Sequence, residues 1–271
     1  MILKILELKM TIMLKEKTTK YQELVRQLYG EEITTFLESN APYLYLKSLP
    51  IQELMENGVD EESINLFLLA LGASLGEVFS YSTHRDGKLV FDIYPVKADS
   101  GEQLGTGTKL DWHTDDAHAP DQCDFICLLC LQGDPNALTL VTNPDWFMRV
   151  KPETQKTLME NLYTIRPDKS YHGAEPLVTP PIKQDDAGVI ELRYDPEFTE
   201  APDETAQKAL LSLETVFAEN STAIEMESGD FMVVNNKVAA HARSNFAPAY
   251  ERGKDRWLKR VIVRKQLAAA E

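Results

Sequence analysis

The chain has 271 residues, of which 43% are apolar and 26% charged, a composition typical of a globular protein with one large domain or two small ones. Its formal net charge of −15 argues against nucleic-acid and anionic-membrane partners, because phosphate binding needs a basic surface. No run approaches the roughly 18 consecutive apolar residues of a membrane span, and the N-terminus lacks the apolar core of a secretion signal, so we expect a cytoplasmic protein.

The first 85 residues are predicted to be mostly helical. Lysines and glutamates interrupt the opening MILKILELKMTIMLKEK every few positions, which indicates an extended start or a short amphipathic helix. Longer helices are expected over residues 19–39 and 61–80. In the second of these, apolar residues recur at helical spacing, at Ile64, Phe67, Leu68, Leu71 and Leu75.

From about Lys88 the pattern changes to short strands and turns. Strands are expected within KLVFDIYPV, GTGTKLDWH, FICLLCL, ALTLVTN, VIELRYD, GDFMVVNN and RWLKRVIVRK, and near Val178. Helices are expected in PETQKTLMENLY and PDETAQKALLSLETVFAE. This order favours a mainly β fold with flanking helices on a double-stranded β-helix (jelly-roll or cupin-like) core, rather than a parallel α/β sheet.

We therefore expect a single domain over residues 1–271. Its core would occupy about 88–265, and an insertion at about 145–220 would form helices and a lid, with 170–202 the segment that covers the site. The sequence leaves the oligomeric state open, and a homodimer is compatible with it.

Three cysteines lie close together, and Cys127 and Cys130 form a C-x-x-C pair. No second cysteine pair exists to complete a zinc site, which disfavours that interpretation. The pair lies in an apolar run that is typical of a buried strand, where residues three apart point to opposite faces. With Cys123, they are predicted to be core thiols in a reducing compartment.

A candidate metal site is formed by His113 and Asp115 in LDWHTDDAH together with His241 in AAHARSNF. In a strand, residues i and i+2 share a face, so the imidazole and the carboxylate would converge. Two histidines and one carboxylate are the set that leaves three positions open on iron(II). A histidine that hydrogen-bonds a neighbouring acid at a turn would give the same tripeptide.

The last predicted strand adds a basic group, because Arg256, Leu258, Arg260 and Ile262 share one of its faces. Both faces are partly apolar, so the strand is expected to be buried, and a buried guanidinium requires an anionic partner. Arg256 could clamp a carboxylate in a bidentate pair beside the metal. An ordinary salt bridge to one of the acidic residues is the alternative.

Taken together, these residues resemble the clavaminate synthase-like branch of the Fe(II)/2-oxoglutarate-dependent oxygenases, which includes free amino acid hydroxylases of the arginine and lysine type. The similar segments are GTGTKLDWHTDDAHAPDQCDFICLLCL, SGDFMVVNNKVAAHARSNFAP and DRWLKRVIVR. They span roughly Leu89 to Arg264.

The resemblance implies a role for each matching residue. His113, Asp115 and His241 look like the catalytic metal ligands, while Arg256 and Thr139 look like the residues that bind 2-oxoglutarate. For the substrate, Arg260 would meet the α-carboxylate and Asp195 a basic side chain. Asp116 is a further candidate for a substrate amine, and His84 for the α-amino group.

The sequence also departs from the family pattern. Many relatives carry H-x-E where this chain has Asp115, and either carboxylate can ligate iron. Ala242 replaces a common glycine, and Asn235 replaces a common aspartate. Some relatives place a glutamine where this chain has YSTHRDG, so His84 would substitute for it. A single acid, Asp195, stands where the arginine hydroxylase has a closely spaced pair, which weakens the guanidine prediction.

The resemblance implies a 2-oxoglutarate-dependent dioxygenase of natural product biosynthesis. It would hydroxylate a free basic L-amino acid such as arginine, lysine or a cyclic arginine derivative like enduracididine, with O2 as co-substrate and succinate and CO2 as products. A radical halogenase is disfavoured, because such enzymes lack the carboxylate that Asp115 supplies. The alternatives are another small or carrier-bound amino acid, a sulfonate oxygenase, and a metal-binding jelly roll without catalysis.

Overall fold

The computed structural model describes residues 2–49, 51, 60–84, 87–96, 109–160, 162–251 and 253–265. The glycine-rich turn predicted at residues 105–107 lies outside these ranges. Across the described part of the chain, every helix is too short or too polar to cross a membrane.

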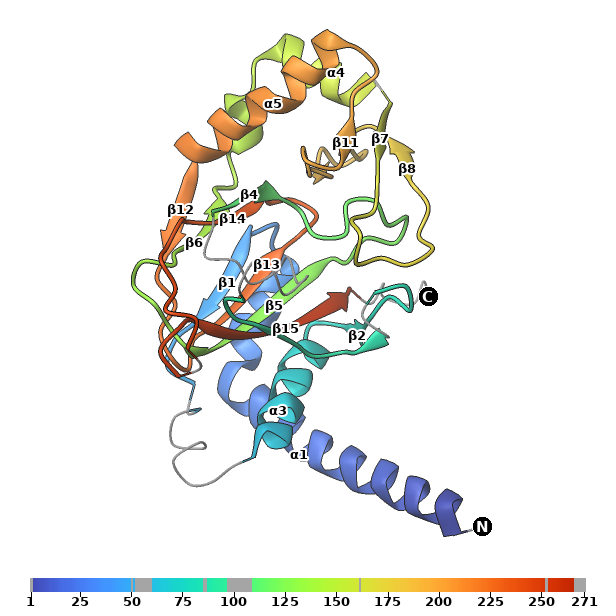
Figure 1. Cartoon of the computed structure of the whole chain (residues 1–271), viewed down its shortest axis with the longest axis vertical. Coiled ribbons are helices and arrows are strands. Elements are labelled where there is room, and N and C mark those ends of the chain that lie inside the picture. Colours follow the sequence, from blue (N-terminus) through green and yellow to red (C-terminus); the bar gives the residue numbers. More distant parts are fainter. Residues whose placement is uncertain are drawn as a thin grey trace.

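The N-terminal part is mostly helical, as predicted, but residues 77–79 of the predicted helix over 61–80 form the strand β2 (Glu77–Phe79), because they pair with residues 262–264 of the last strand. The first helix, α1 (Ile2–Glu38), begins well before the predicted start of the long helix and includes the opening segment. The second, α3 (Glu61–Ala73), begins at Asp60, whose side chain accepts a hydrogen bond from the Ser63 amide and so caps the helix. Figure 1 shows both helices on one side of the β-structure.

The larger sheet has six strands, and within the described residues all of its pairings are antiparallel. Its order is β1-β13-β5-β15-β2, with β3 also paired to β15. The strands are β1 (Tyr43–Leu46), β13 (Phe231–Asn235), β5 (Phe125–Gln132), β15 (Trp257–Arg264), β2 (Glu77–Phe79) and β3 (Phe91–Ile93).

The two central strands of this sheet, β5 and β15, are buried on both faces, as the sequence predicted. Cys127 packs with the residues that face α1 and α3, whereas Cys130 packs on the opposite face. The cysteines are free thiols, which agrees with their predicted role in the core. Along β15, Val261 and Val263 face the helices, and Leu258 and Ile262 face the interior between the sheets.

The smaller sheet has the order β12-β6-β14-β4 and is also antiparallel. Its strands are β12 (Ser221–Ile224), β6 (Thr139–Thr142), β14 (His241–Arg243) and β4 (Leu110–His113). It contributes Val141 and Ile224 to the apolar layer that it shares with the larger sheet. Its other face contributes Trp112, Ala240 and Ala242 to a second core.

The insertion between β6 and β12 covers this second core. It contains η4 (Trp146–Arg149), α4 (Pro152–Glu160), β7 (Tyr163–Ile165), β8 (Leu177–Thr179), β9 (Ile182–Gln184), β10 (Ile190–Leu192), β11 (Thr199–Glu200) and α5 (Glu204–Glu219). Leu210, Leu213 and Phe217 of α5 pack with Trp112. In Figure 1, α4 and α5 lie at the opposite end of the molecule from α1 and α3.

The predicted fold class is confirmed at the level of a mainly antiparallel β-protein with flanking helices. The helices bury the outer faces of the two sheets, because each sheet is apolar on both faces and neither could be exposed to water. The space between the sheets therefore contains both an apolar layer and the polar residues described next.

Candidate metal centre and pocket

The two sequence-predicted histidines lie on neighbouring strands of the smaller sheet. His113 ends β4, and its Cα partner on β14 is His241. The centroids of the two imidazole rings are 4.2 Å apart. Antiparallel pairing therefore brings two histidines that are distant in sequence onto the same point.

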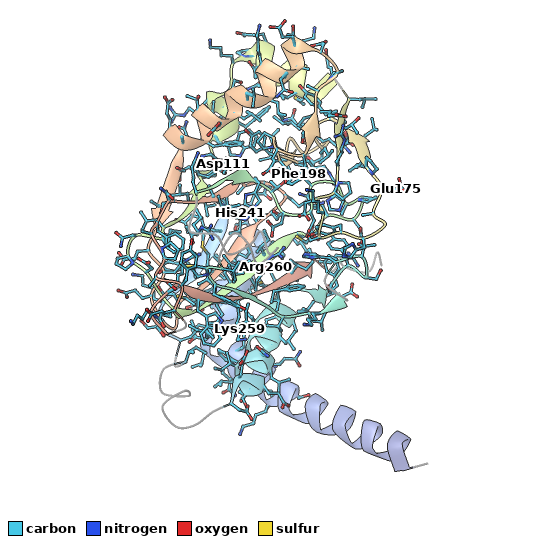
Figure 2. The ribbon with its side chains drawn as sticks, viewed as in Figure 1. Asp111, Glu175, Phe198, His241, Lys259 and Arg260 are labelled. Carbon is cyan, nitrogen blue, oxygen red and sulfur yellow. The ribbon has the colours of Figure 1, made fainter. Side chains whose placement is uncertain are left out.

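The Asp115 carboxylate completes this group. Its Oδ1 atom lies 3.1 Å from His113 Nε2 and 3.5 Å from His241 Nε2. One potential ligand atom from each of the three residues lies within 4.8 Å of the others. Figure 2 shows His241 inside the molecule, between the sheets.

Asp115 reaches this position from a turn, which corrects the expectation that it would lie two residues along a strand. The strand β4 ends at His113, and Asp115 belongs to the turn that follows. The Asn236 side chain holds the turn, accepting from the Asp115 amide at 2.8 Å and donating to its carbonyl at 2.9 Å. Gln122 donates to the same carbonyl at 3.0 Å. The side-chain amides of Asn236 and Gln122 thus fix the position of Asp115, which strand pairing does not.

The electrostatics of the three residues fit ligation of a cation. Burial opposes the charged form of Asp115, but the Arg260 guanidinium and both histidines hold the pKa of its carboxyl well below the usual value. Burial lowers the pKa of His241 to about 3, so its imidazole is neutral. For His113, burial also favours the neutral ring, but the Asp115 carboxylate outweighs it and raises the pKa.

The hydrogen bonds of the two histidine rings also suit ligation of a divalent metal such as iron(II). Nδ1 of His113 lies 2.8 Å from the Asp111 carbonyl, so the tautomer that donates there leaves Nε2 free as a ligand. Nδ1 of His241 is buried without a hydrogen-bond partner among the described residues. Two imidazole nitrogens and a carboxylate oxygen would occupy one side of the ion.

A pocket of about 1530 Å³ opens beside this group. His113 and Asp115 line it, together with Arg260 of β15 from the facing sheet. Arg260 donates a hydrogen bond to Asp115 Oδ2. Burial lowers the pKa of Arg260, but the carboxylates of Asp115 and Asp116 outweigh this effect and raise it. In Figure 2, Arg260 lies between β15 and the smaller sheet, whereas Lys259 points the other way, with Nζ 2.8 Å from both Glu61 and Asp92.

Arg256 and Thr139 are brought together by the fold, as the resemblance implied for a shared ligand. Arg256 is 6% exposed and donates to Thr139 Oγ1 at 2.7 Å. Burial lowers the pKa of Arg256 to about 10. Within the described ranges no carboxylate forms a salt bridge with Arg256, and its Nε has no hydrogen-bond partner, so an anionic ligand would satisfy it. Neither Arg256 nor Thr139 lines the pocket, whereas Arg243 of β14 does.

Two further acids line the pocket. Asp116 has a side chain that is 2% exposed, and burial raises the pKa of its carboxyl. Asp195 follows β10 in the insertion, and burial raises its pKa to about 6, with Glu197 adding to the effect and His113 opposing it. The insertion therefore places Asp195 at the pocket, as predicted.

His84 also lines the pocket and is buried against the rings of Phe91 and Tyr171. His118 is 7% exposed and contacts Tyr171 edge-on, with centroids 4.4 Å apart. Tyr171 from the insertion therefore covers His118, which also lines the pocket. His172, in contrast, is exposed.

Several residues of the site carried no clear signal in the sequence. Arg193 and Tyr171 hold the Asp115–Pro120 turn or its side chains from the distant insertion, and Gln122 holds the turn from seven residues beyond Asp115. Asn236 holds the same turn from 121 residues away. Arg243 had a usable signal, since in H-A-R it lies two residues after His241 in one strand and so shares its face.

Residues 52–262 match the family described as taurine catabolism dioxygenase TauD, TfdA family. Among curated relatives, an enduracididine beta-hydroxylase from Streptomyces hygroscopicus is 27% identical over 71% of this chain and 64% of that protein. An L-ornithine/L-arginine 3-hydroxylase from Catenulispora acidiphila is 28% identical over 78% of this chain and 71% of that protein. The chain thus spans just under two thirds of the first relative.

Solved structures are similar as well. The non-heme iron oxygenase OrfP in complex with Fe and alpha-ketoglutaric acid matches with a TM-score of 0.64 and 34% identity over 76% of this chain and 65% of that one. An asparagine oxygenase in complex with Fe(II), 2S,3S-3-hydroxyasparagine and succinate matches with a TM-score of 0.78 over 92% of this chain and 83% of that one. At 24% identity, the second likeness shows the fold alone.

Proposed function

The chain belongs to the taurine catabolism dioxygenase TauD, TfdA family, and from this we propose that it is an Fe(II)- and 2-oxoglutarate-dependent dioxygenase that hydroxylates a free basic L-amino acid. Arginine, lysine and a cyclic arginine derivative such as enduracididine are the candidate substrates. The observation that carries the proposal is the convergence of His113, Asp115 and His241 beside a pocket with both acidic and basic walls.

In this proposal His113, Asp115 and His241 hold the iron. Bound iron(II), with 2-oxoglutarate and dioxygen, would supply the oxidising power to hydroxylate an unactivated carbon, with release of succinate and CO2. The chain keeps Asp115 ionised through Arg260 and keeps His241 neutral through burial, which are the protonation states that ligation requires.

Arg256 and Thr139 are proposed to bind the distal carboxylate of 2-oxoglutarate. The support is a buried guanidinium that no described carboxylate pairs, held by a hydroxyl 2.7 Å away. A planar guanidinium can give a carboxylate two parallel hydrogen bonds. Arg243, beside Thr139 across the β14–β6 pairing, adds positive charge at the same end.

The substrate would lie between opposite charges. Arg260 is proposed to meet the α-carboxylate, and Asp116 and His84, which also line the pocket, are proposed to meet the α-amino group. Asp195 is proposed to meet the basic end of the side chain. The named activities of the similar hydroxylases, on enduracididine, ornithine, arginine and lysine, support a basic substrate.

We also propose that the two facing sheets form a double-stranded β-helix (jelly-roll) core within a single domain, with residues 145–220 as a lid-bearing insertion. The likeness to solved non-heme iron oxygenases supports this arrangement. Three buried free thiols support a cytoplasmic location.

The test is a coupled assay with Fe(II), 2-oxoglutarate and oxygen against a panel of the common L-amino acids and guanidino analogues. Succinate release and a product that has gained one oxygen atom are expected for a basic amino acid. Oxygen gain on a neutral amino acid alone would refute the basic substrate. An asparagine oxygenase is 28% identical to this chain, so asparagine belongs in the panel. Absence of succinate with every substrate would favour a metal-binding protein without catalysis.

A further inference from the structure

Tyr171 of the insertion contacts two other segments of the pocket through its side chain. Its hydroxyl donates to Asp116 Oδ1. Its ring stacks on His84, with centroids 4.3 Å apart and planes 15° apart, and meets His118 edge-on. Three segments that are far apart in sequence therefore meet on one aromatic side chain.

The backbone fixes Tyr171 in this place. It forms an antiparallel bridge with His84, and the next amide, that of His172, donates to the Thr83 carbonyl at 2.8 Å. On the other side, the Tyr171 amide donates to the Asp168 carbonyl at 3.2 Å. These main-chain contacts place Tyr171 at the junction between the insertion and the segment before β3.

One oxygen of the Asp116 carboxylate has no hydrogen-bond partner among the described residues. Its backbone is in the left-handed region (φ 57°), which an aspartate tolerates better than most residues and which aims the side chain inward. Tyr171 occupies Oδ1, whereas Oδ2 is buried with no hydrogen-bond partner among the residues that the structure describes. The nearest cation is Arg260, with NH2 4.0 Å from Oδ2. An unsatisfied buried carboxylate oxygen is costly unless a ligand meets it.

Asp116 and Arg260 thus present opposite charges side by side on the pocket wall. Arg260 still has a free donor after its bond to Asp115, because its Nε has no hydrogen-bond partner among the described residues. A free α-amino acid carries an ammonium and a carboxylate on one carbon, so its two charges are spaced like those of this pair. The match is specific for a free amine, since an N-acylated amine has lost its charge.

We propose that Tyr171 is a positioning residue that selects free α-amines by holding Asp116 Oδ1, so that Oδ2 accepts from the substrate ammonium. This inference rests on the proposed function and adds to it a residue and a rule of selection. Without the hydroxyl, the Asp116 carboxylate is free to rotate toward Arg260, and the preference for an amine is reduced.

The experiment compares Tyr171→Phe with the wild-type enzyme by anaerobic calorimetry of the Fe(II)- and 2-oxoglutarate-loaded protein. The ligands are the preferred amino acid, its N-acetyl derivative and its analogue without the amine. Tyr171→Phe keeps the ring stacking, so the dissociation constant of the amino acid is expected to rise roughly tenfold, with the two analogues unchanged. KM should rise in parallel while kcat stays near the wild-type value.

The matched control is Tyr163→Phe. Tyr163 is a buried tyrosine of the same insertion whose hydroxyl donates to the Ala206 carbonyl at 2.9 Å, outside the pocket. It should lose a similar amount of thermal stability without any change in amino acid binding. A second variant, Asp116→Asn, keeps the acceptor for Tyr171 and removes the charge, and should abolish the preference for the free amine.

Equal weakening of the amino acid and its amine-free analogue in Tyr171→Phe would assign the residue a structural role and overturn the inference. Unchanged binding of all three ligands would do the same. These outcomes are distinct from failure of the proposed function, in which the wild-type protein itself neither binds nor oxidises any amino acid, and which would overturn both.

Discussion

Asp115, Asp116 and Asp195 line one pocket, but their surroundings differ. Asp115 lies against Arg260 and two imidazoles, so its pKa is lowered. Asp116 is buried and held by the Tyr171 hydroxyl, and burial raises its pKa. Burial raises the pKa of Asp195 to about 6, and Asp195 forms no salt bridge with a described residue. Different environments thus give the three carboxyls of one pocket different pKa values.

Replacing Asp195 with asparagine should raise the KM of a basic substrate about 10- to 100-fold, because a charge-assisted hydrogen bond contributes about 1.5–3 kcal/mol. The wild-type KM should also rise as the pH falls through about 6, since protonation removes the charge that attracts the substrate. Steady-state kinetics across pH checks both effects. Asp186→Asn, an exposed acid in the β9–β10 turn, is the control. An Asp195→Asn enzyme with wild-type KM would remove Asp195 from the substrate site.

Substitutions of Arg256 are expected to change the KM for 2-oxoglutarate. Arg256→Lys keeps the charge but loses the bidentate geometry, and Arg256→Met also loses the charge. We expect KM for 2-oxoglutarate to rise at least about 30-fold in Arg256→Met, because truncating one partner of a buried charge pair costs about 2–5 kcal/mol, with a smaller rise in Arg256→Lys. Arg149→Met, at an exposed ion pair with Asp145, serves as the control. A similar KM in all three variants would contradict the assignment.

At the scale of elements, strands and a turn position the site in different ways. The pairing of β4 with β14 sets the separation of His113 and His241. Asp115 instead depends on a turn that Arg193 holds from the insertion, donating to the carbonyls of Ala117, Ala119 and Pro120 at 2.9, 2.6 and 3.2 Å. The Thr114 amide also donates to the Tyr194 carbonyl at 2.6 Å. The insertion therefore supports the metal site as well as covering it.

Arg193→Met should weaken iron binding although Arg193 touches no ligand, because three carbonyls of the turn lose their donor. The free energy of unfolding should fall by at least about 2 kcal/mol, since buried acceptors are left unsatisfied. Metal titration and thermal unfolding measure the two effects. Lys237→Met is the control. Lys237 Nζ lies 3.0 Å from Glu191 Oε1 and does not contact the turn, so this variant should bind iron normally. Unchanged iron affinity in Arg193→Met would show that Asn236 and Gln122 suffice.

At the scale of the whole molecule, the site joins the two sheets. The histidines come from the smaller sheet, and Arg256 and Arg260 come from or directly precede β15 of the larger one. The pocket also includes Asp195 and Tyr171 of the insertion. Ligands that contact all of these parts would bind only the folded state, so they should stabilise the whole domain.

Iron and 2-oxoglutarate together should therefore raise the melting temperature under anaerobic conditions. At a concentration 100 times the dissociation constant, a ligand adds about 2.7 kcal/mol of stability. A chelator should reverse the metal-dependent part, and His241→Ala should abolish it while leaving the remaining core packed. Differential scanning calorimetry distinguishes these cases. An equal rise in His241→Ala would place the metal elsewhere.

Much of the fold followed from local patterns. The apolar run FICLLCL and the partly apolar faces of RWLKRVIVRK correctly predicted strands buried on both faces, and the assignment of Cys127 and Cys130 to opposite faces needed only the two-residue period of a strand. The helices α3, α4 and α5 lie within segments that were predicted to be helical. The grouping of His113, Asp115 and His241 came from motif order, which the strand pairing now places in space.

The sequence by itself determined the element types, the buried faces of the strands and the candidate ligands, because these depend on residue type and short-range periodicity. Only the tertiary structure decided that Asp115 lies on a turn held by Asn236, that Tyr171 meets Asp116, and that His118 is covered. Each of these contacts joins residues at least 53 positions apart. Such contacts form only when the sheets and the insertion pack together, so no local pattern records them.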